Sequence, residues 1–360
     1  MHIVYLIERI DKKGGIQRSL TKRVNYLINN YNYKFTIVCT EKESGIPAYK
    51  IHESVNFIFL DNLNIKNSVI GRFLLRYRQS KMILKNLQPN ILISAKYTLH
   101  NFFFKFINNK AKLISEIREP KKQYNQINTL SLKSKIYRKT RDWVFKNQDI
   151  LITLTAADKK NWGFNNIKVV PNPQTIQSDK VSNLNNKVVL ALGRLHKIKG
   201  FDKLIDVWKI VNLKHPDWKL KICGEGEEYK NLYNKTIKLK LEKSIIFTNK
   251  FVSVTPELLN SSIFVLTSQF EAFGNVMVEA KVCGVPIVAF DAPNGPKEII
   301  IENEDGFVVE LNNIEQMAEK IIYLIENPNV RKKMGEKAKI NSEKYDVETI
   351  VEKYNDVILS

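Results

Sequence analysis

Short apolar runs alternate along the chain with longer amphipathic stretches. The apolar run Ile3–Ile7 is followed by a glycine-containing loop and then by Ser19–Asn29, where apolar residues recur at helical spacing; a second apolar run follows at Phe35–Cys39. A strand, a loop, a helix and a second strand in this order form a βαβ unit, which implies a parallel sheet. We therefore expect an α/β domain at the start of the chain.

The same pattern continues through the first half and then restarts near residue 188. The further strands predicted in the first half are Ile91–Ser94, Leu113–Ser115 and Ile150–Thr153, with helices at about 71–87 and 131–145. In the second half the predicted strands are Val188–Leu192, Leu220–Cys223, Ile245–Phe247, Ile263–Thr267, Pro286–Ala289 and Gly306–Val309. Helices are predicted between them at about 201–213, 227–241, 276–283 and 314–326. The chain thus contains two similar units.

The boundary between the units is predicted at Val170–Pro173, because two prolines in three residues cannot continue either sheet. A length of 360 residues also suits two domains of ordinary size. We expect two doubly wound, Rossmann-like α/β domains facing each other across a cleft, with ligands at the carboxyl ends of the strands. The predicted domains are residues 1–170 and 171–340, and a C-terminal helix at 341–360 is expected to pack back toward the first domain.

The composition excludes several classes of protein. With 44% hydrophobic and 26% charged residues, the chain is neither largely disordered nor collagen-like. No apolar run approaches the roughly 20 residues that span a bilayer. The start lacks a basic segment, and Glu8 and Arg9 interrupt its apolar run, so we expect no signal peptide and a cytoplasmic location. Three widely separated cysteines fit neither a zinc site nor a disulfide framework.

The net positive charge is confined to the first half of the chain. Residues 1–170 hold 31 Lys and Arg against 11 Asp and Glu, a balance of +20, whereas residues 171–360 hold 26 of each. This asymmetry favours a polyanion or an anionic membrane as a partner of the first half. The predicted helices 71–87 and 131–145 mix cations such as Arg76 and Arg141 with aromatic residues such as Trp143. That mixture suits peripheral attachment to the inner face of the cytoplasmic membrane, although ordinary solvated helices have similar sequences.

Two glutamates separated by seven residues form the densest chemical motif. Glu271 follows the predicted strand Ile263–Thr267, and Phe273, Gly274, Asn275 and Val276 open the helix that carries Glu279. Unpaired backbone N–H groups at a helix start attract phosphate or hydroxyl oxygens, and a glycine lets a ligand approach the backbone closely. The motif predicts a site for a phosphorylated sugar.

A second motif, Gly193-Arg-Leu-His-Lys-Ile-Lys-Gly200, also follows a strand directly. Arg194 and Lys199 can converge on a diphosphate, the arginine through a bidentate fork and the lysine as a point charge. Cations on a loop are usually just solvated. Glycines on both sides and the nearby strand end favour a phosphate clamp.

Together these two motifs and the stretch Ala280–Asp291 resemble the retaining glycosyltransferases of family four, which have the GT-B fold. The resemblance covers nearly the whole chain. It implies that the C-terminal domain binds a nucleotide sugar, with UDP favoured, and that the N-terminal domain binds a saccharide or lipid-linked acceptor. Such an enzyme moves a hexose or N-acetylhexosamine during synthesis of cell-surface polysaccharide, lipopolysaccharide or capsule.

The resemblance also implies roles for individual residues. Arg194 and Lys199 would hold the diphosphate and Glu271 the donor sugar beside the Phe273–Val276 backbone, while Glu279 would bind the ribose. In the family, two further glycine-containing loops lie near the donor. Their glycines match Gly14 and Gly15 after the first strand, and Gly224 and Gly226 in the second domain. No cofactor and no metal are expected, because no Asp-x-Asp pair is placed to bind one.

Two further assignments concern the first domain. The segment Ser115–Pro120 resembles one found in enzymes that build cell-surface polysaccharides, which places Glu116 and Arg118 on the acceptor side. His100 follows the strand Ile91–Ser94, about where family members often carry a histidine near the donor sugar.

Three other functions compete with this interpretation. A nucleotide-sugar epimerase would share the fold but needs a different set of carboxylates and histidines, which we do not find. A nucleic-acid-binding protein could use the basic first half, yet no RNA-binding signature is present and the neutral second half would be idle, so no nucleic acid is expected. A catalytically dead scaffold is disfavoured by the intact Arg194, Lys199, Glu271 and Glu279.

Overall fold

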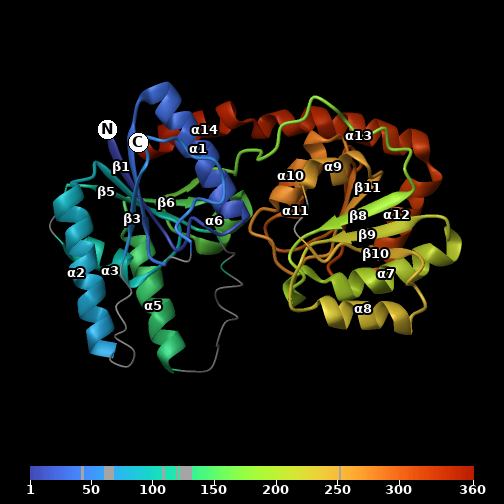
Figure 1. Cartoon of the computed structure of the whole chain (residues 1–360), viewed down its shortest axis with the longest axis horizontal. Coiled ribbons are helices and arrows are strands. Elements are labelled where there is room, and N and C mark those ends of the chain that lie inside the picture. The colour runs from blue at the N-terminus through green and yellow to red at the C-terminus, as the bar shows by residue number, and fades with distance from the viewer. Residues whose placement is uncertain (42–43, 61–68, 108–109, 119–120, 122–131, 251–252) are drawn as a thin grey trace. The chain divides into compact units, whose positions relative to one another are not determined.

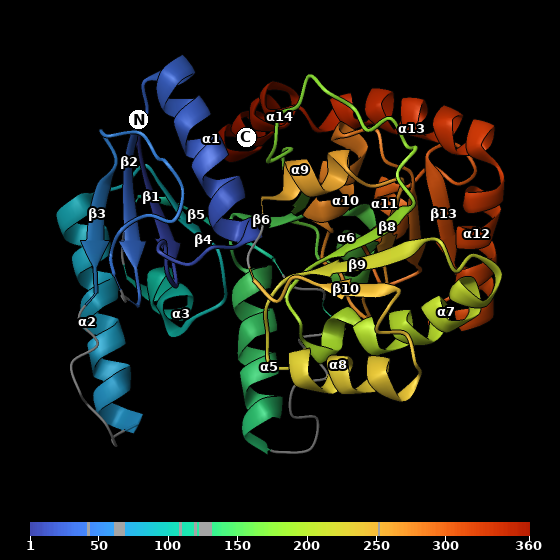
Figure 2. The ribbon, with the colours of Figure 1, turned by 45° about the vertical axis from the view of Figure 1, so that its right-hand side comes forward.

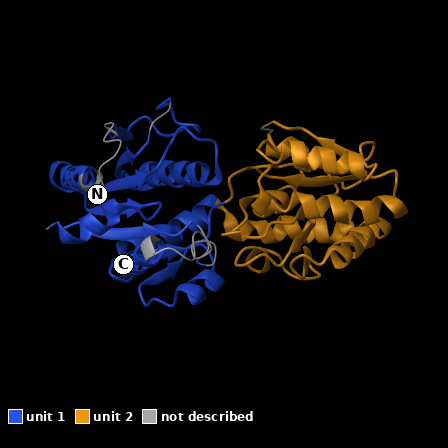
Figure 3. Cartoon of the chain, turned by 90° about the horizontal axis from the view of Figure 1, so that it is seen from below, with its two compact units in different colours: residues 1–173, 347–360 blue, residues 174–346 orange. Residues whose placement is uncertain are grey.

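The computed structural model describes residues 1–41, 44–60, 69–107, 110–118, 121, 132–250 and 253–360. The chain forms two compact units, the first made of Met1–Pro173 with Val347–Ser360 and the second of Gln174–Asp346 (Figure 3). Residues 171–173 therefore stay with the first unit, and the second unit extends six residues beyond the predicted end at 340.

The first unit is built on a seven-stranded parallel sheet in the order β3-β2-β1-β4-β5-β6-β7 (Figure 1). Its strands are β1 (His2–Ile7), β2 (Lys34–Cys39), β3 (Asn56–Phe59), β4 (Ile91–Ser94), β5 (Lys112–Glu116), β6 (Ile150–Thr153) and β7 (Ile167–Val169). Its helices are α1 (Gly15–Tyr31), α2 (Val69–Leu87), α3 (Leu99–Phe106), α5 (Leu132–Lys146), α6 (Ala156–Trp162) and α14 (Val347–Leu359). The helix predicted at 131–145 is α5, and residue 131 lies outside the described residues.

Both faces of this sheet are covered by helices. Alternate residues of β1 point to opposite faces: Ile3 and Tyr5 pack with α1 and α14, whereas Val4 and Leu6 pack with α2 and α3. Burial on both sides explains why the strands appear in the sequence as continuous apolar runs and not as alternating ones. Helices α2 and α3 pack against each other, and α3 also contacts α5 (Figure 2).

The second unit is built on a six-stranded parallel sheet in the order β10-β9-β8-β11-β12-β13. Its strands are β8 (Val188–Leu192), β9 (Lys219–Cys223), β10 (Ile245–Phe247), β11 (Ile263–Leu266), β12 (Ile287–Phe290) and β13 (Gly306–Val309). Its helices are α7 (Phe201–Lys214), α8 (Tyr229–Lys238), α9 (Val254–Leu259), α10 (Asn275–Val282), α11 (Pro296–Ile299), α12 (Ile314–Glu326) and α13 (Pro328–Ser342), with short 3₁₀ turns at Lys197–Lys199 and Glu343–Tyr345.

The C-terminal segment is divided between the two units. Helix α13 packs on α10 inside the second unit, whereas α14 packs on α1 inside the first. The contact of α14 includes hydrogen bonds from the hydroxyl groups of Tyr26 and Tyr31 to Glu352. No helix in the described ranges is long and apolar enough to cross a membrane.

Candidate functional site

The two predicted motifs meet at the centre of the second sheet. After β8 the chain winds outward through β9 to β10 and then returns to β11 on the other side of β8. The loops after β8 and β11 therefore diverge from adjacent strands, which is the topological switch point where doubly wound sheets bind ligands. The first loop is Gly193–Gly200 and the second is Thr267–Gly274.

A charged pair connects these loops. The Lys199 ammonium group contacts the Glu271 carboxylate, and the Ser268 hydroxyl donates a 2.9 Å hydrogen bond to the same Glu271 oxygen. The Thr267 hydroxyl donates to the carbonyl of Lys199 at 3.1 Å, which ties the two loops together through the backbone as well. The side chains of Lys199 and Glu271 remain 24% and 11% exposed. The pair is thus held in place while keeping access to solvent.

Glycines let a third loop approach this pair. Gly224 has a φ of +148°, and a Cβ atom there would overlap the carbonyl oxygen of Gly193; one on Gly226 would overlap that of Leu195. The loops are joined by backbone hydrogen bonds from Gly193 N–H to the carbonyl of Cys223 (3.1 Å) and from Leu195 N–H to that of Glu225 (2.8 Å). Gly224 and Gly226 therefore lie beside the Gly193–Gly200 loop; their predicted contact with a nucleotide stays a prediction.

Helix α10 starts next to the charged pair. Gly274 precedes it at a φ of +96°, a conformation that favours glycine, and Asn275 and Val276 form its half-buried first turn. The Phe273 side chain is buried and packs edge-on against Tyr345. The Phe273 side chain is therefore not available to a ligand, and the predicted role of the Phe273–Val276 backbone beside the donor sugar stays a prediction.

Two predicted donor residues differ in exposure. Arg194 is exposed on the Gly193–Gly200 loop. Glu279, in contrast, is 1% exposed and accepts a hydrogen bond from the Thr175 hydroxyl. Its role in binding a ribose stays a prediction, and in this structure Glu279 ties the segment after the inter-unit boundary to α10.

Gly14 and Gly15 lie in the first unit, where Gly14 precedes α1 and Gly15 is its first residue. The Gln17 side chain reaches back over this loop and donates to the carbonyl of Arg9 at 2.7 Å. The two glycines form the predicted loop after β1, and their approach to phosphates stays a prediction.

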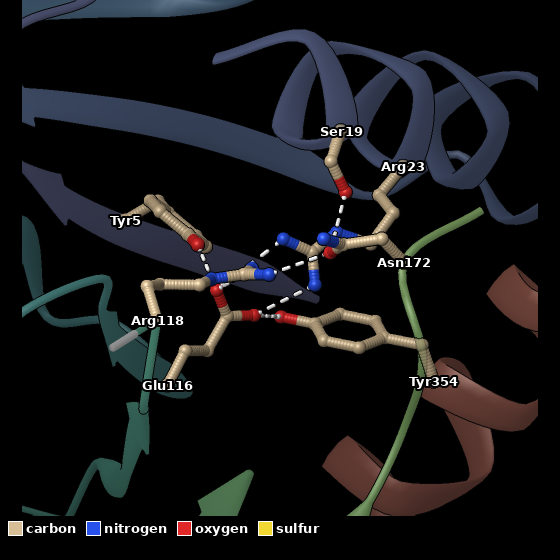
Figure 4. A network of polar contacts seen from close by, with 7 residues as sticks. All are labelled: Tyr5, Ser19, Arg23, Glu116, Arg118, Asn172 and Tyr354. Carbon is tan, nitrogen blue, oxygen red and sulfur yellow. Dashed lines mark hydrogen bonds and ion pairs between the residues drawn. The ribbon is translucent and has the colours of Figure 1, made fainter. Parts of the chain in front are cut away.

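Glu116 and Arg118 belong to a buried polar network in the first unit (Figure 4). Glu116 is 1% exposed and contacts both Arg118 and Arg23, the latter at 2.8 Å. The hydroxyl groups of Tyr5 and Tyr354 donate to the same carboxylate. The predicted acceptor-side role of Glu116 is not supported by this geometry, because protein groups occupy both of its oxygens.

The network also joins the two stretches of chain that make up the first unit, residues 1–173 and 347–360. Asn172, just before the unit boundary, accepts hydrogen bonds from Arg118 (2.7 Å) and from the Ser19 hydroxyl (3.0 Å). Tyr354 lies on α14, which returns from the second unit. Burial alone would raise the pKa of Glu116, but Arg118, Arg23 and the two tyrosine hydroxyls lower that pKa to about 2. Glu116 is therefore ionised throughout the physiological range.

The prediction that His100 serves the donor sugar is not supported by its surroundings. His100 belongs to α3 and is 1% exposed; its Nδ1 lies 3.0 Å from the hydroxyl of Ser80 on α2, and its ring stacks on Phe104. Burial, reinforced by the charge of Arg76, lowers the pKa of His100 to about 3. A neutral, enclosed imidazole can neither touch a substrate nor act as an acid or base near neutral pH.

Sequence reasoning missed two contributors to the site in the second unit. Ser268 holds the Glu271 carboxylate, and Asn294 forms an isolated β-bridge with Glu271. Gly295 packs so closely that a Cβ atom would lie 2.6 Å from the carbonyl oxygen of Phe273. The Asn294-Gly295-Pro296 sequence after β12 is a turn signal, but its position against Glu271 depends on strand order. In the described part of the chain, no three His, Cys, Asp or Glu residues are grouped to hold a metal.

Known proteins resemble this chain both in sequence and in fold. Residues 173–341 match the family described as glycosyl transferases group 1. The chain is 40% identical over 215 residues to an uncharacterized glycosyltransferase of Haemophilus influenzae, a match that covers 58% of this chain and 61% of that protein. It is 28% identical over 372 residues to the amylovoran biosynthesis glycosyltransferase AmsD of Erwinia amylovora, covering 99% of both.

A solved structure of Staphylococcus aureus TarM, in complex with UDP, Fondaparinux and alpha-GlcNAc-glycerol, superposes with a TM-score of 0.79 over 100% of both chains at 18% identity. At this identity the likeness concerns the fold, two Rossmann-like α/β units of the GT-B type. The fold class and the family resemblance predicted from the sequence motifs are confirmed.

Proposed function

Because residues 173–341 match the group 1 glycosyl transferases, we propose that the chain is a retaining glycosyltransferase of cell-surface glycan synthesis. Its donor is a UDP-sugar carrying a hexose or N-acetylhexosamine, and its acceptor is a saccharide or lipid-linked saccharide at the membrane. The observation that carries this proposal is the Lys199–Glu271 pair at the switch point of the second sheet, with Arg194 exposed on the same loop.

The donor site in this proposal has two chemical parts. Arg194 and Lys199 neutralise the diphosphate, and the Glu271 carboxylate accepts hydrogen bonds from the hydroxyl groups of the donor sugar. Lys199 and Glu271 contact each other in this structure. In the proposed complex the diphosphate replaces Glu271 as the partner of Lys199, and a sugar hydroxyl replaces Lys199 as the partner of Glu271, so each side chain keeps one polar interaction.

The transfer step requires little covalent chemistry from the protein. The acceptor hydroxyl oxygen bonds to C1 of the donor sugar on the face that the diphosphate leaves, and the bond from C1 to the diphosphate oxygen breaks. The hydroxyl proton passes to that departing oxygen. The cations of the Gly193–Gly200 loop stabilise the negative charge that develops on the diphosphate, so the configuration at C1 is kept without a protein nucleophile.

Calorimetric titration with UDP, GDP and ADP tests the donor assignment. We expect UDP to bind with micromolar affinity, and Arg194→Ala to lose most of that binding while keeping its melting temperature. Binding of GDP or ADP in preference to UDP would replace the nucleotide in the proposal. A folded protein that binds none of the three would refute the donor site itself.

Apolar side chains exposed beside cations support membrane attachment. On one face of the first unit, α2 exposes Phe73, α3 exposes Phe106 and α5 exposes Ile136 and Trp143; Phe106, 61% exposed, stacks on Trp143. We call this surface the α2–α3–α5 face. The same three helices also expose cations: Lys81 on α2, Lys105 on α3, and Lys135 and Lys139 on α5. Apolar side chains beside cations favour an anionic lipid surface.

One part of the sequence prediction for this face was wrong. Arg141, Val144 and Phe145 point into the first unit, where Arg141 lies over the Trp162 ring at 4.9 Å. They cannot reach a lipid surface, and α3, which was not predicted as a helix, supplies exposed residues in their place. Flotation with vesicles tests the attachment: we expect binding to anionic vesicles and little to neutral ones, and equal binding to both would refute the electrostatic attachment.

A further inference from the structure

Two donors share one oxygen of the Glu271 carboxylate, and they differ in their freedom to move. The Lys199 ammonium group and the Ser268 hydroxyl, the latter at 2.9 Å, both contact Oε1 of Glu271. Within the described residues no donor contacts its Oε2. The Lys199 group lies at the end of a flexible side chain that is 24% exposed. Ser268, in contrast, is 1% exposed, and its hydroxyl is attached directly to Cβ.

The backbone on both sides of Ser268 is tied to the 3₁₀ turn that ends in Lys199. On one side, the Thr267 hydroxyl donates to the carbonyl of Lys199 at 3.1 Å. On the other side, the Gln269 N–H donates to the carbonyl of Ile198 at 2.8 Å. Because both neighbours are held and the side chain is short, the Ser268 hydroxyl occupies a fixed position in the site.

The backbone of Glu271 is held by a different loop. Glu271 forms an isolated parallel β-bridge with Asn294, in the turn after β12. A Cβ atom on Gly295 would lie 2.9 Å from the Cβ atom of Glu271, so a glycine is needed for this turn to approach so closely. The backbone and Oε1 of Glu271 are thus both fixed, and Oε2 remains for a ligand.

We propose that Ser268 is a positioning residue whose hydroxyl holds the Glu271 carboxylate in place for the donor sugar after Lys199 has turned to the diphosphate. This role rests on the proposed function, in which the diphosphate replaces Glu271 as the partner of Lys199. After that exchange, the Ser268 hydrogen bond still fixes Oε1. Without it the carboxylate would rotate freely, and the sugar hydroxyls would have to order it at a cost in entropy.

Calorimetric titration of the full chain with UDP and with UDP-glucose, UDP-galactose and UDP-N-acetylglucosamine tests the proposal. The quantity compared between variants is the ratio of the affinity for a UDP-sugar to the affinity for UDP. We expect Ser268→Ala to lower this ratio at least tenfold for the sugar that the wild type binds best, and to leave the affinity for UDP unchanged. A general disturbance of the fold would weaken both affinities together and keep the ratio constant.

Ser261→Ala is the matched control. Ser261 lies two residues before β11, as Ser268 lies two residues after it. It is fully buried and donates a 2.9 Å hydrogen bond to the carbonyl of Leu258. Its replacement should leave the ratio unchanged. In a Glu271→Ala background, Ser268→Ala should lower the ratio no further, because the serine acts only through the carboxylate.

Three results would overturn the role of Ser268 and leave the donor site standing. The first is an unchanged ratio in Ser268→Ala when Glu271→Ala lowers it. The second is an equal loss of UDP and UDP-sugar affinity in Ser268→Ala, which would make the serine purely structural. The third is a further loss in the Glu271→Ala background, which would mean that the serine contacts the donor itself. A wild type that does not bind UDP, or an unchanged ratio in Glu271→Ala, would refute the proposed donor site and the role of Ser268 with it.

Discussion

Glu116 is the last residue of a buried parallel strand, and Glu271 lies in the loop after another. Each carboxylate contacts at least one positively charged side chain. Glu116 ends β5, away from the switch point of its sheet, and two arginines and two tyrosines surround its carboxylate. Glu271 follows β11 at the switch point, contacts one lysine and one serine, and keeps access to solvent. A saturated, enclosed carboxylate stabilises a fold, whereas a half-satisfied, accessible one can bind a ligand.

The comparison predicts that removing charge from Glu116 mainly affects stability. Glu116→Gln leaves Arg23 and Arg118 buried without a counter-charge and should lower the free energy of unfolding by about 3–5 kcal/mol at neutral pH. Turnover of the remaining folded protein should be nearly unchanged. Chemical denaturation followed by circular dichroism measures the loss, with the exposed Glu53→Gln as control.

The pH dependence of this loss has a definite sign. The folded pKa of Glu116, about 2, lies below its ordinary value of 4.5, so the stabilisation is complete above pH 4.5 and disappears as the pH falls toward 2. The difference in unfolding free energy between wild type and Glu116→Gln should shrink over that range. A difference that stays constant with pH would show that the carboxylate charge is not the stabilising feature.

For Lys199, in contrast to Glu116, we expect a large loss of activity and little loss of stability. Lys199→Ala should lower kcat/KM by about 10²–10³-fold, the effect of removing one group that stabilises developing charge in a transition state. Because the side chain is partly exposed, its ion pair should contribute less than about 1 kcal/mol to stability. Lys197→Ala, on the same 3₁₀ turn and exposed, is the control. Equal turnover in the two variants would remove Lys199 from the site.

The two units should also differ in their affinity for lipid. Replacing Lys135 and Lys139 on α5 by Gln removes two cations worth ~1 kcal/mol each near an anionic surface, so vesicle binding should weaken about 30-fold. Replacing the exposed Lys332 and Lys333 on α13 of the second unit changes the net charge equally. We expect the Lys332 and Lys333 replacements to change vesicle binding little. A similar loss of vesicle binding for both pairs would mean that net charge, not the α2–α3–α5 face, controls attachment.

The smallest effect is expected at His100. With a pKa of about 3, its ring should show no titration in NMR spectra between pH 5 and 8. The folded pKa lies below the ordinary 6.5, so burial of the neutral ring costs stability only as the pH falls from 6.5 toward 3. A transition of His100 near pH 6.5 would contradict its enclosed position.

Local pattern was sufficient to predict most of the sheets. The strands Ile91–Ser94 and Val188–Leu192 appear where predicted because burial on both faces requires a continuous apolar run. The short strands β3 and β7 and the helices α3, α6, α9 and α11 were missed. Helix α3, Leu99–Phe106, has only eight residues, which is shorter than the window of about 11–18 residues over which a helical period can be recognised.

The sequence by itself determined the two-unit α/β organisation, the family resemblance and the residues of the Gly193–Gly200 and Glu271–Glu279 motifs, because each depends on residues close together in the chain. Only the tertiary structure decided which charged groups are enclosed. Tyr354 reaches Glu116 across 238 positions, and Arg76 reaches the strand ends of the first sheet from a helix. Burial and pairing arise from such distant contacts, so similar residues became a structural network in one unit and an accessible site in the other.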